Sequence, residues 1–404
     1  SIFFHSSLTA EPFSDSIFPE SWVIDTNLEY SKEMLSAQRT IVNKVPYLLE
    51  SYETNLLQTG KVYVSGHALY SQYFEHSNTA GKFPILGRFP NQHTKGTSAN
   101  ESILDMADIS LTYAPSEWVS LFVHGIYTDL QFPSQEESQV REAFLSLGNL
   151  DELPWYISIG RLTANFGNQQ SYNPVTHTVN NHFFRVDTYD MASEFGYVGD
   201  NWRFAFTALD GGRQLRVADT PNSTYGSNFA LSGQYDIELA DSMVSIGGGY
   251  LYSSIYDSDN ANHPGVHSNP QTTRVRNGLL NIWAEAKRGD FSLMGELTQT
   301  ERDWPASGAP VQAFTLQTAY DTEICSKDTR FSLVYGKGTL GNDGDQWESL
   351  VQIAAGVETY LSDNFAVSAE FVHNRSFIPL IMLDRVADRD VETNTFIVSG
   401  SLFF

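Results

Sequence analysis

The sequence is poor in several features that mark common protein classes. Its 404 residues include a single cysteine, Cys325, so it has neither a disulfide framework nor a cysteine-based zinc cluster. It has no uninterrupted apolar run of about 20 residues, the length that a membrane-spanning helix needs. Lysine and arginine number 24 against 48 aspartates and glutamates, and the net charge of −24 argues strongly against nucleic acid as a partner.

Motifs for catalysis or cofactor binding are also missing. There is no glycine-rich phosphate loop, no pair of histidines at metal-binding spacing and no G-x-S-x-G turn. Gly247, Gly248 and Gly249 fall within a strand pattern, where glycine eases bending or makes room for a neighbour. We therefore expect no enzyme activity, no cofactor and no bound metal.

Aromatic residues, in contrast, are plentiful. They make up 13% of the chain, although its mean hydropathy is only −0.27. This combination is typical of a transmembrane β-barrel, in which only alternate residues of each strand face lipid. The end of the chain shows the alternation clearly, with Phe396, Val398, Gly400 and Leu402 on one face and Thr395, Ile397, Ser399, Ser401 and Phe403 on the other. A strand that stops on phenylalanine also resembles the C-terminal assembly signal of bacterial outer-membrane barrels.

Sixteen such segments follow one another, at 61–74, 101–114, 117–130, 139–150, 154–163, 186–198, 201–211, 227–239, 243–256, 275–288, 290–301, 309–324, 327–338, 346–360, 363–376 and 393–404. The connections between them are alternately short and long. Short turns on one rim and long loops on the other are the arrangement of outer-membrane barrels, whose short turns are periplasmic. We therefore predict an all-β fold, a transmembrane antiparallel β-barrel of about 16 strands over residues 61–404. It would lie in a bacterial outer membrane among lipid and lipopolysaccharide (LPS), with both termini periplasmic.

Residues 1–60 have a different pattern. Pro12 and Pro19 interrupt the first part, whereas residues 27–57 carry apolar side chains at helical intervals, and Pro46 is expected to kink or split that helix. The segment is thus a short, partly helical extension. Either it packs in the periplasm against the mouth of the barrel, or it enters the lumen as a small plug. Because residue 1 is serine and no signal peptide is visible, we expect a mature, processed chain.

Six acidic residues occupy strand positions that alternate with apolar ones. A charge at the middle of a bilayer costs several kcal/mol, so these side chains should point into a wet lumen. They are Asp108, Glu142, Glu194, Glu285, Glu296 and Glu370.

The most informative connection is the third long loop, residues 164–185, which in sixteen-stranded porins commonly folds inward. Although the chain is acidic, this loop contains no aspartate or glutamate. Its amide and histidine side chains, with nearby arginines, could hold a carboxylate-bearing solute or a metal chelate by hydrogen bonds. The candidate substrate-binding residues are Arg161, Asn165, Gln169, Gln170, Tyr172, His177, His182, Arg185 and Arg203. The alternative is an ordinary polar surface loop.

Two consecutive segments carry a family resemblance. Residues 139–167 contain Glu142, Ala143, Phe144, Gly148, Asn149, Pro154, Trp155, Tyr156, Gly160, Phe166 and Gly167 in an order that resembles the LbtU-type siderophore porins of Legionella and related Gram-negative bacteria. The resemblance implies a sixteen-stranded receptor-like porin and iron transport, with uptake of a ferric siderophore or a similar small iron chelate independent of TonB. The alternatives are a general, cation-preferring diffusion porin and a structural barrel with a filled lumen. The sequence leaves open whether the chain is monomeric or forms a homo-oligomer.

Overall fold

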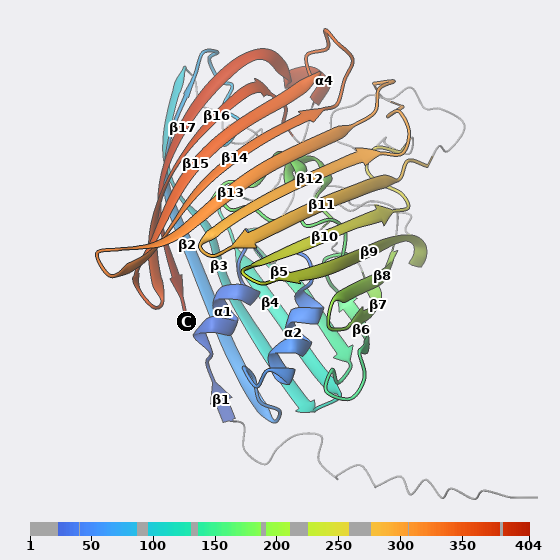
Figure 1. The fold of residues 1–404 in the computed structure, drawn as a ribbon. Coiled ribbons are helices and arrows are strands. Elements are labelled where there is room, and N and C mark those ends of the chain that lie inside the picture. The colour runs from blue at the N-terminus through green and yellow to red at the C-terminus, as the bar shows by residue number, and fades with distance from the viewer. Residues whose placement is uncertain are drawn as a thin grey trace, which may run out of the picture.

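Sixteen antiparallel strands close into a barrel in the computed structural model, which describes residues 23–39, 41–86, 96–130, 136–186, 191–210, 225–257, 276–305, 307–379 and 383–404 (Figure 1). The strands are β2 (Lys61–Ser77), β3 (Ser98–Ser116), β4 (Val119–Tyr127), β5 (Ser138–Leu147), β6 (Trp155–Arg161), β7 (Ala192–Val198), β8 (Trp202–Asp210), β9 (Tyr225–Leu239), β10 (Ser242–Leu251), β11 (Leu279–Arg288), β12 (Phe291–Thr300), β13 (Gln312–Ile324), β14 (Lys327–Thr339), β15 (Ser349–Ser362), β16 (Phe365–Phe377) and β17 (Asp388–Phe403). Each strand pairs with its neighbours in the sequence, and β17 closes the ring against β2. The prediction of a barrel of about sixteen strands is confirmed.

The wall of the barrel has an apolar outer face and a polar inner face. In β12, Phe291, Leu293 and Leu297 are exposed, whereas Glu296 and Thr298 at alternate positions are buried. The same alternation recurs along the other strands. It is the reverse of a soluble protein and fits a wall that faces lipid on the outside. Among the described residues, no helix has the length and apolar character needed to cross a membrane.

A short parallel strand, β1 (Val23–Asp25), extends the wall where β17 stops. Phe404 forms backbone hydrogen bonds with Gly66, so β17 leaves the first residues of β2 without a partner. β1 takes that place by pairing with Lys61–Tyr63, and Asp25 forms an ion pair of 3.0 Å with Lys61. The sequence patterns did not predict this strand, because three residues are too few to show an alternation.

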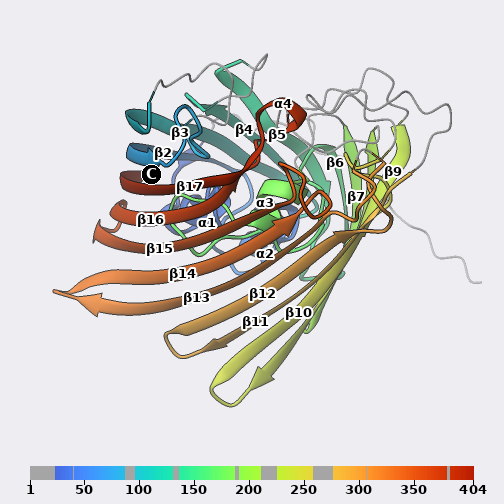
Figure 2. The same cartoon turned by 90° about the horizontal axis from the view of Figure 1, so that it is seen from above.

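Two helices, α1 (Leu28–Met34) and α2 (Lys44–Glu53), lie inside the barrel toward its short-turn end (Figures 1 and 2). The expected kink or split at Pro46 is wrong, because the two helices are separated by residues 35–43 and Asn43, with a φ of 64°, is the N-cap of α2. Pro46 lies in the first turn of α2, where the missing N–H costs no helical hydrogen bond. We call the described residues between 26 and 57 the inner segment.

The third long loop also folds into the barrel. It carries the short helix α3 (Val179–Phe184), which packs against the inner face of β14 at Gly336 and Gly338. A Cβ atom at Gly336 would stand 2.6 Å from Val179, so the two glycines make the space that the helix fills. One more short helix, α4 (Leu383–Val386), precedes β17.

Candidate functional site

All six acidic residues predicted to face the lumen lie on the inner face of the wall and are buried. The expectation of a wet lumen around them does not describe their surroundings, because the inner segment and the third long loop cover them. Asp108, Glu142, Glu194, Glu285, Glu296 and Glu370 are each at most 7% exposed. Each carboxylate has nearby polar partners, as buried charges require.

Two of these carboxylates hold the third long loop by its backbone. Glu296 accepts hydrogen bonds from the amides of Asn168 (2.9 Å) and Gln169 (3.3 Å). Glu370 accepts from two further loop amides, Val175 (3.0 Å) and Thr176 (3.1 Å). Because the loop has no acidic residue of its own, it can lie against these carboxylates without repulsion between like charges. The absence of acidic residues from the loop is therefore explained by its contact with these carboxylates, as well as by the solute binding that the sequence analysis expects.

A row of charged and titratable side chains crosses the inner wall from the inner segment toward β17. Lys44 forms an ion pair of 2.7 Å with Glu142. The ring nitrogens of His124 lie 3.5 Å from Glu142 and 3.3 Å from Asp108, and His67 lies 3.4 Å from the other oxygen of Asp108. The sequence analysis missed His67 and His124. Their positions in the strand alternation, on the same face as the acids, are the signal that could have found them.

Three of the candidate binding residues, His177, His182 and Arg185, border a cavity of about 180 Å³ toward the long-loop end of the barrel. We call it the loop-end cavity. Its other polar lining residues include Gln38, Asp105, Thr128, Arg141, Asn181, Gln352 and Asn374. Asp105 is the single acidic residue in this lining, and it already accepts hydrogen bonds from Ser71 and Tyr73. None of the six predicted lumen acids borders this cavity.

The remaining candidates anchor the inner parts of the protein to one another. Asn165 accepts a hydrogen bond of 3.1 Å from the backbone amide of Asn43, which joins the third long loop to the inner segment. Gln169 is fully buried, and the carbonyl oxygen of Gln170 accepts a hydrogen bond of 3.0 Å from Gln317. These contacts therefore position the loop.

Tyr172, Arg203 and Arg161 also lie outside the lining of the loop-end cavity. Burial raises the pKa of Tyr172, and the neighbouring carboxylate of Glu285 raises it further, so the phenol stays protonated and donates to Glu285. Arg203 forms an ion pair of 2.7 Å with Glu50 of α2. Burial raises the pKa of the Glu50 carboxyl, whereas the positive charge of Arg203 opposes that shift. Arg161 is the last residue of β6 and is half-buried.

Several further cavities border the inner segment, and two of them lie toward β13 to β17. The middle cavity, of about 40 Å³, is bordered by Lys32, Ser36 and Arg39 of the inner segment and by residues of β15 to β17 and β2. The turn-end cavity, of about 810 Å³, opens among the short turns. Its lining contains Asp290, Asp321, Glu323, Asp328, Glu358 and Asp363 together with Lys32, Arg39, Lys327 and Arg330. The described residues contain no cluster of three or more histidine, cysteine or acidic side chains arranged to hold a metal ion.

Solved structures of outer-membrane porins share this fold. OmpF of Salmonella typhi in complex with daunomycin is 12% identical, covers 85% of this chain and 98% of its own length, and superposes with a TM-score of 0.55. An anion-selective porin from Comamonas acidovorans is 10% identical (85% and 99% covered, TM-score 0.54), and the outer-membrane channel DcaP of Acinetobacter baumannii is 12% identical (85% and 97% covered, TM-score 0.53). No family model matches the chain, and no curated protein matches it. The chain therefore has the porin fold, and its resemblance to siderophore porins stays a prediction.

Proposed function

We propose that the protein is a channel of a bacterial outer membrane that passes a small, hydrophilic, carboxylate-bearing solute without chemical change. Its short turns and both termini would then lie in the periplasm. The fold supports a channel, and the lining of the loop-end cavity supports the choice of solute. Arg141 and Arg185 border that cavity together with two histidines, in a chain whose net charge is −24.

The distribution of charge is the observation that carries this proposal. Most acidic side chains of the inner wall are covered, and their charges are engaged by the inner segment, by histidines or by backbone amides of the third long loop. A solute that reaches the loop-end cavity would meet Arg141, Arg185 and two histidines in its lining, against Asp105 as the single acidic residue. Arginine binds carboxylates with paired, charge-assisted hydrogen bonds, which favours an anion over a cation at this point.

Within this class of solute, we propose a small ferric chelate, as the family resemblance implies, taken up without coupling to TonB. The loop-end cavity of about 180 Å³ is smaller than the roughly 300–1,000 Å³ of sites for drug-sized ligands, so it suits a compact carboxylate chelate. A large siderophore would have to displace the third long loop or the inner segment before it could pass.

A general cation-preferring porin is the second candidate. It is favoured by the turn-end cavity, whose lining holds six acidic residues against four basic ones. Acidic linings concentrate cations, so this end of the barrel alone would give cation preference. The two candidates therefore differ in which end of the barrel sets the selectivity.

Electrical recording from the refolded protein in a planar bilayer distinguishes them. Under a potassium chloride gradient, we expect a reversal potential of anion-selective sign and a reversible block by ferric citrate that iron-free citrate causes more weakly. Replacing both cavity arginines, Arg141→Gln with Arg185→Gln, should shift the reversal potential toward cation selectivity. The matched control is Arg288→Gln, because this arginine pairs with Asp241 at an exposed short turn. A cation-selective current that ferric citrate leaves unchanged would contradict the proposal and favour the general porin.

A further inference from the structure

We infer that the solute path runs between the inner segment and the inner faces of β15, β16, β17 and β2, and that the ion pair between Arg39 and Glu358 is its selectivity-determining point. This inference rests on the proposed function, because it places the route of a solute that the channel is proposed to pass. It concerns residues that the sequence analysis did not single out. Arg39 lies in the inner segment and Glu358 on β15.

The three cavities are neighbours, because each shares lining residues with the next. Ala37, Gln38 and Leu69 border both the loop-end cavity and the middle cavity. The residues that border both the middle and the turn-end cavity are Lys32, Arg39, Glu358 and Tyr360. The series thus leads from the long-loop end, past residues 32–39, to the short turns.

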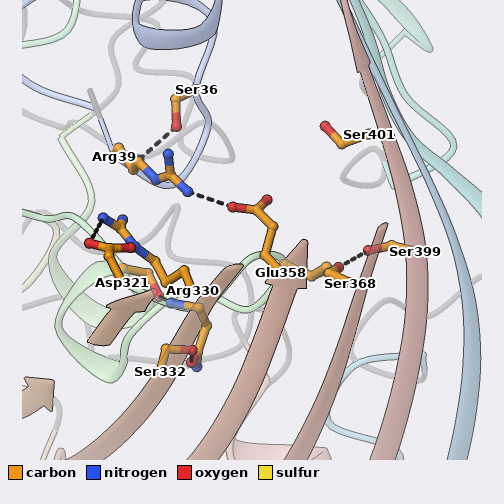
Figure 3. Close-up of polar contacts among 12 residues, drawn as sticks. Ser36, Arg39, Asp321, Arg330, Ser332, Glu358, Ser368, Ser399 and Ser401 are labelled. Atoms are coloured by element: carbon orange, nitrogen blue, oxygen red, sulfur yellow. Dashed lines mark hydrogen bonds and ion pairs between the residues drawn. The ribbon is translucent and has the colours of Figure 1, made fainter. Parts of the chain in front are cut away.

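The middle cavity is the narrow point of this series. It has a volume of about 40 Å³ and lies between cavities of about 180 Å³ and 810 Å³. A water molecule occupies roughly 30 Å³, so the middle cavity has room for little more than one. Figure 3 shows the ion pair of Arg39 and Glu358 at this level, with Ser368, Ser399 and Ser401 on the strands beside Glu358. The lining also includes Tyr360 and Phe403 of the wall and Asn173 and Pro174 of the third long loop, so the ion pair supplies the charge at this narrow point.

On the other side of the inner segment, a cavity of about 20 Å³ borders Asn43 and Pro46 and one of about 210 Å³ borders Leu49 and Tyr52, but neither shares a lining residue with the loop-end cavity. There α2 packs against aromatic side chains of β4, β5 and β6. Leu48 of α2 and Phe122, Phe144 and Tyr156 of the wall are all buried, the last three at no more than 4% exposed. Close-packed apolar side chains leave no space for a hydrated solute.

The ion pair is placed so that the carboxylate of an anionic solute can replace Glu358 as the partner of Arg39. Arg39 Nη2 lies 2.6 Å from Glu358 Oε2, and the side chain of Arg39 is 33% exposed. A guanidinium has five N–H donors, so a solute carboxylate that reaches Arg39 can compete with Glu358 for it. A second pair of the same kind, Arg330 with Asp321 at 2.6 Å, borders the turn-end cavity beyond it (Figure 3). A carboxylate-bearing solute would thus meet Arg39 at the narrow point and Arg330 in the turn-end cavity beyond it.

Two charge-removing variants test the inference in bilayer recordings. Arg39→Gln leaves Glu358 unpaired at the narrow point, so the permeability ratio of chloride to potassium should fall several-fold. Glu358→Gln leaves Arg39 unpaired, so the same ratio should rise. The diagnostic result is that the two variants change the permeability ratio in opposite directions. Arg288→Gln at the exposed turn should leave the ratio unchanged.

If the wild-type channel is anion-selective but neither variant changes the ratio, the path lies elsewhere and the inference is overturned while the proposed function stands. If the wild-type protein passes no current, both fail.

If a charge-removing variant does not fold, the reactivity of a cysteine placed beside the path tests the inference instead. In a Cys325→Ser background, Ser368→Cys should react with an anionic thiol reagent, and the reaction should reduce the conductance. The control is Ser146→Cys, because Ser146 is fully buried against Ser158. Reaction at position 368 with no change in conductance would overturn the inference.

Discussion

The two sides of the inner segment are held to the barrel in different ways. On the side of β4 to β6, apolar side chains of α2 interdigitate with wall aromatics, and Lys44 forms a buried ion pair with Glu142. On the side of β15 to β17, residues 32–39 contact the wall through Lys32 over the ring of Tyr360 and through Arg39 with Glu358. The first side is held by a packed apolar cluster, and the second by polar contacts beside the middle and turn-end cavities. A segment that is packed more tightly on one side than on the other can narrow a pore without sealing it.

The largest expected effect falls on the packed side. Lys44→Met leaves the Glu142 carboxylate, 3% exposed, without its lysine partner. Removing one member of a buried ion pair costs about 3–5 kcal/mol, and here that cost should reduce the free energy that holds α2 in the barrel. Hydrogen exchange of the α2 amides in the refolded barrel would measure it.

The double variant Lys44→Met with Glu142→Leu is the control for this prediction. It removes both charges, so exchange protection of α2 should return most of the way to the wild-type level. If Lys44→Met alone leaves the protection of α2 unchanged, the packed side does not depend on this ion pair.

An intermediate effect is expected where the third long loop meets β14. A valine at position 338 would overlap the ring of Phe183, so Gly338→Val should displace α3 from the wall. Overpacking of this kind costs about 1–3 kcal/mol, and because α3 borders the loop-end cavity, the single-channel conductance should change as well. Urea unfolding and bilayer recording would measure the two effects.

Gly295→Val on β12 is the matched control, because the nearest atom to its added Cβ would lie 4.0 Å away, on Leu316. Equal effects of the two substitutions would show that the close approach of α3 to β14 is not what stabilises the loop.

The wall of the barrel could be predicted from the sequence, because each strand carries its own alternation. The observed strands fall within a few residues of the predicted segments, and they differ mainly at the long-loop ends. For example, the last strand begins at Asp388 rather than at residue 393. Alternation also places Glu296 and Glu370 on the inner face, because successive side chains of a strand point to opposite faces of the sheet.

The contents of the barrel could not be predicted in the same way. Glu296 accepts hydrogen bonds from amides 128 and 127 residues away in sequence, and Arg39 pairs with Glu358 across 319 residues. Local patterns carry no information about such distant partners. The sequence shows a loop without acidic residues and a set of acidic residues on the inner face of the strands. Only the folded chain shows that the loop lies against those acidic residues.

The smallest effect is expected on the polar side of the inner segment. The ammonium of Lys32 lies 4.3 Å from the centre of the Tyr360 ring, at the border of the middle and turn-end cavities. A cation over an aromatic ring at a solvated site contributes about 0.5–1 kcal/mol, so Lys32→Gln should leave the protection of α2 and the urea midpoint nearly unchanged. Its effect should instead appear in the recordings, as a small shift toward cation selectivity, because a positive charge beside the path is lost. If Lys32→Gln destabilised the inner segment as strongly as Lys44→Met, the two sides would be equally anchored, and the contrast between a packed side and a permeable side would be wrong.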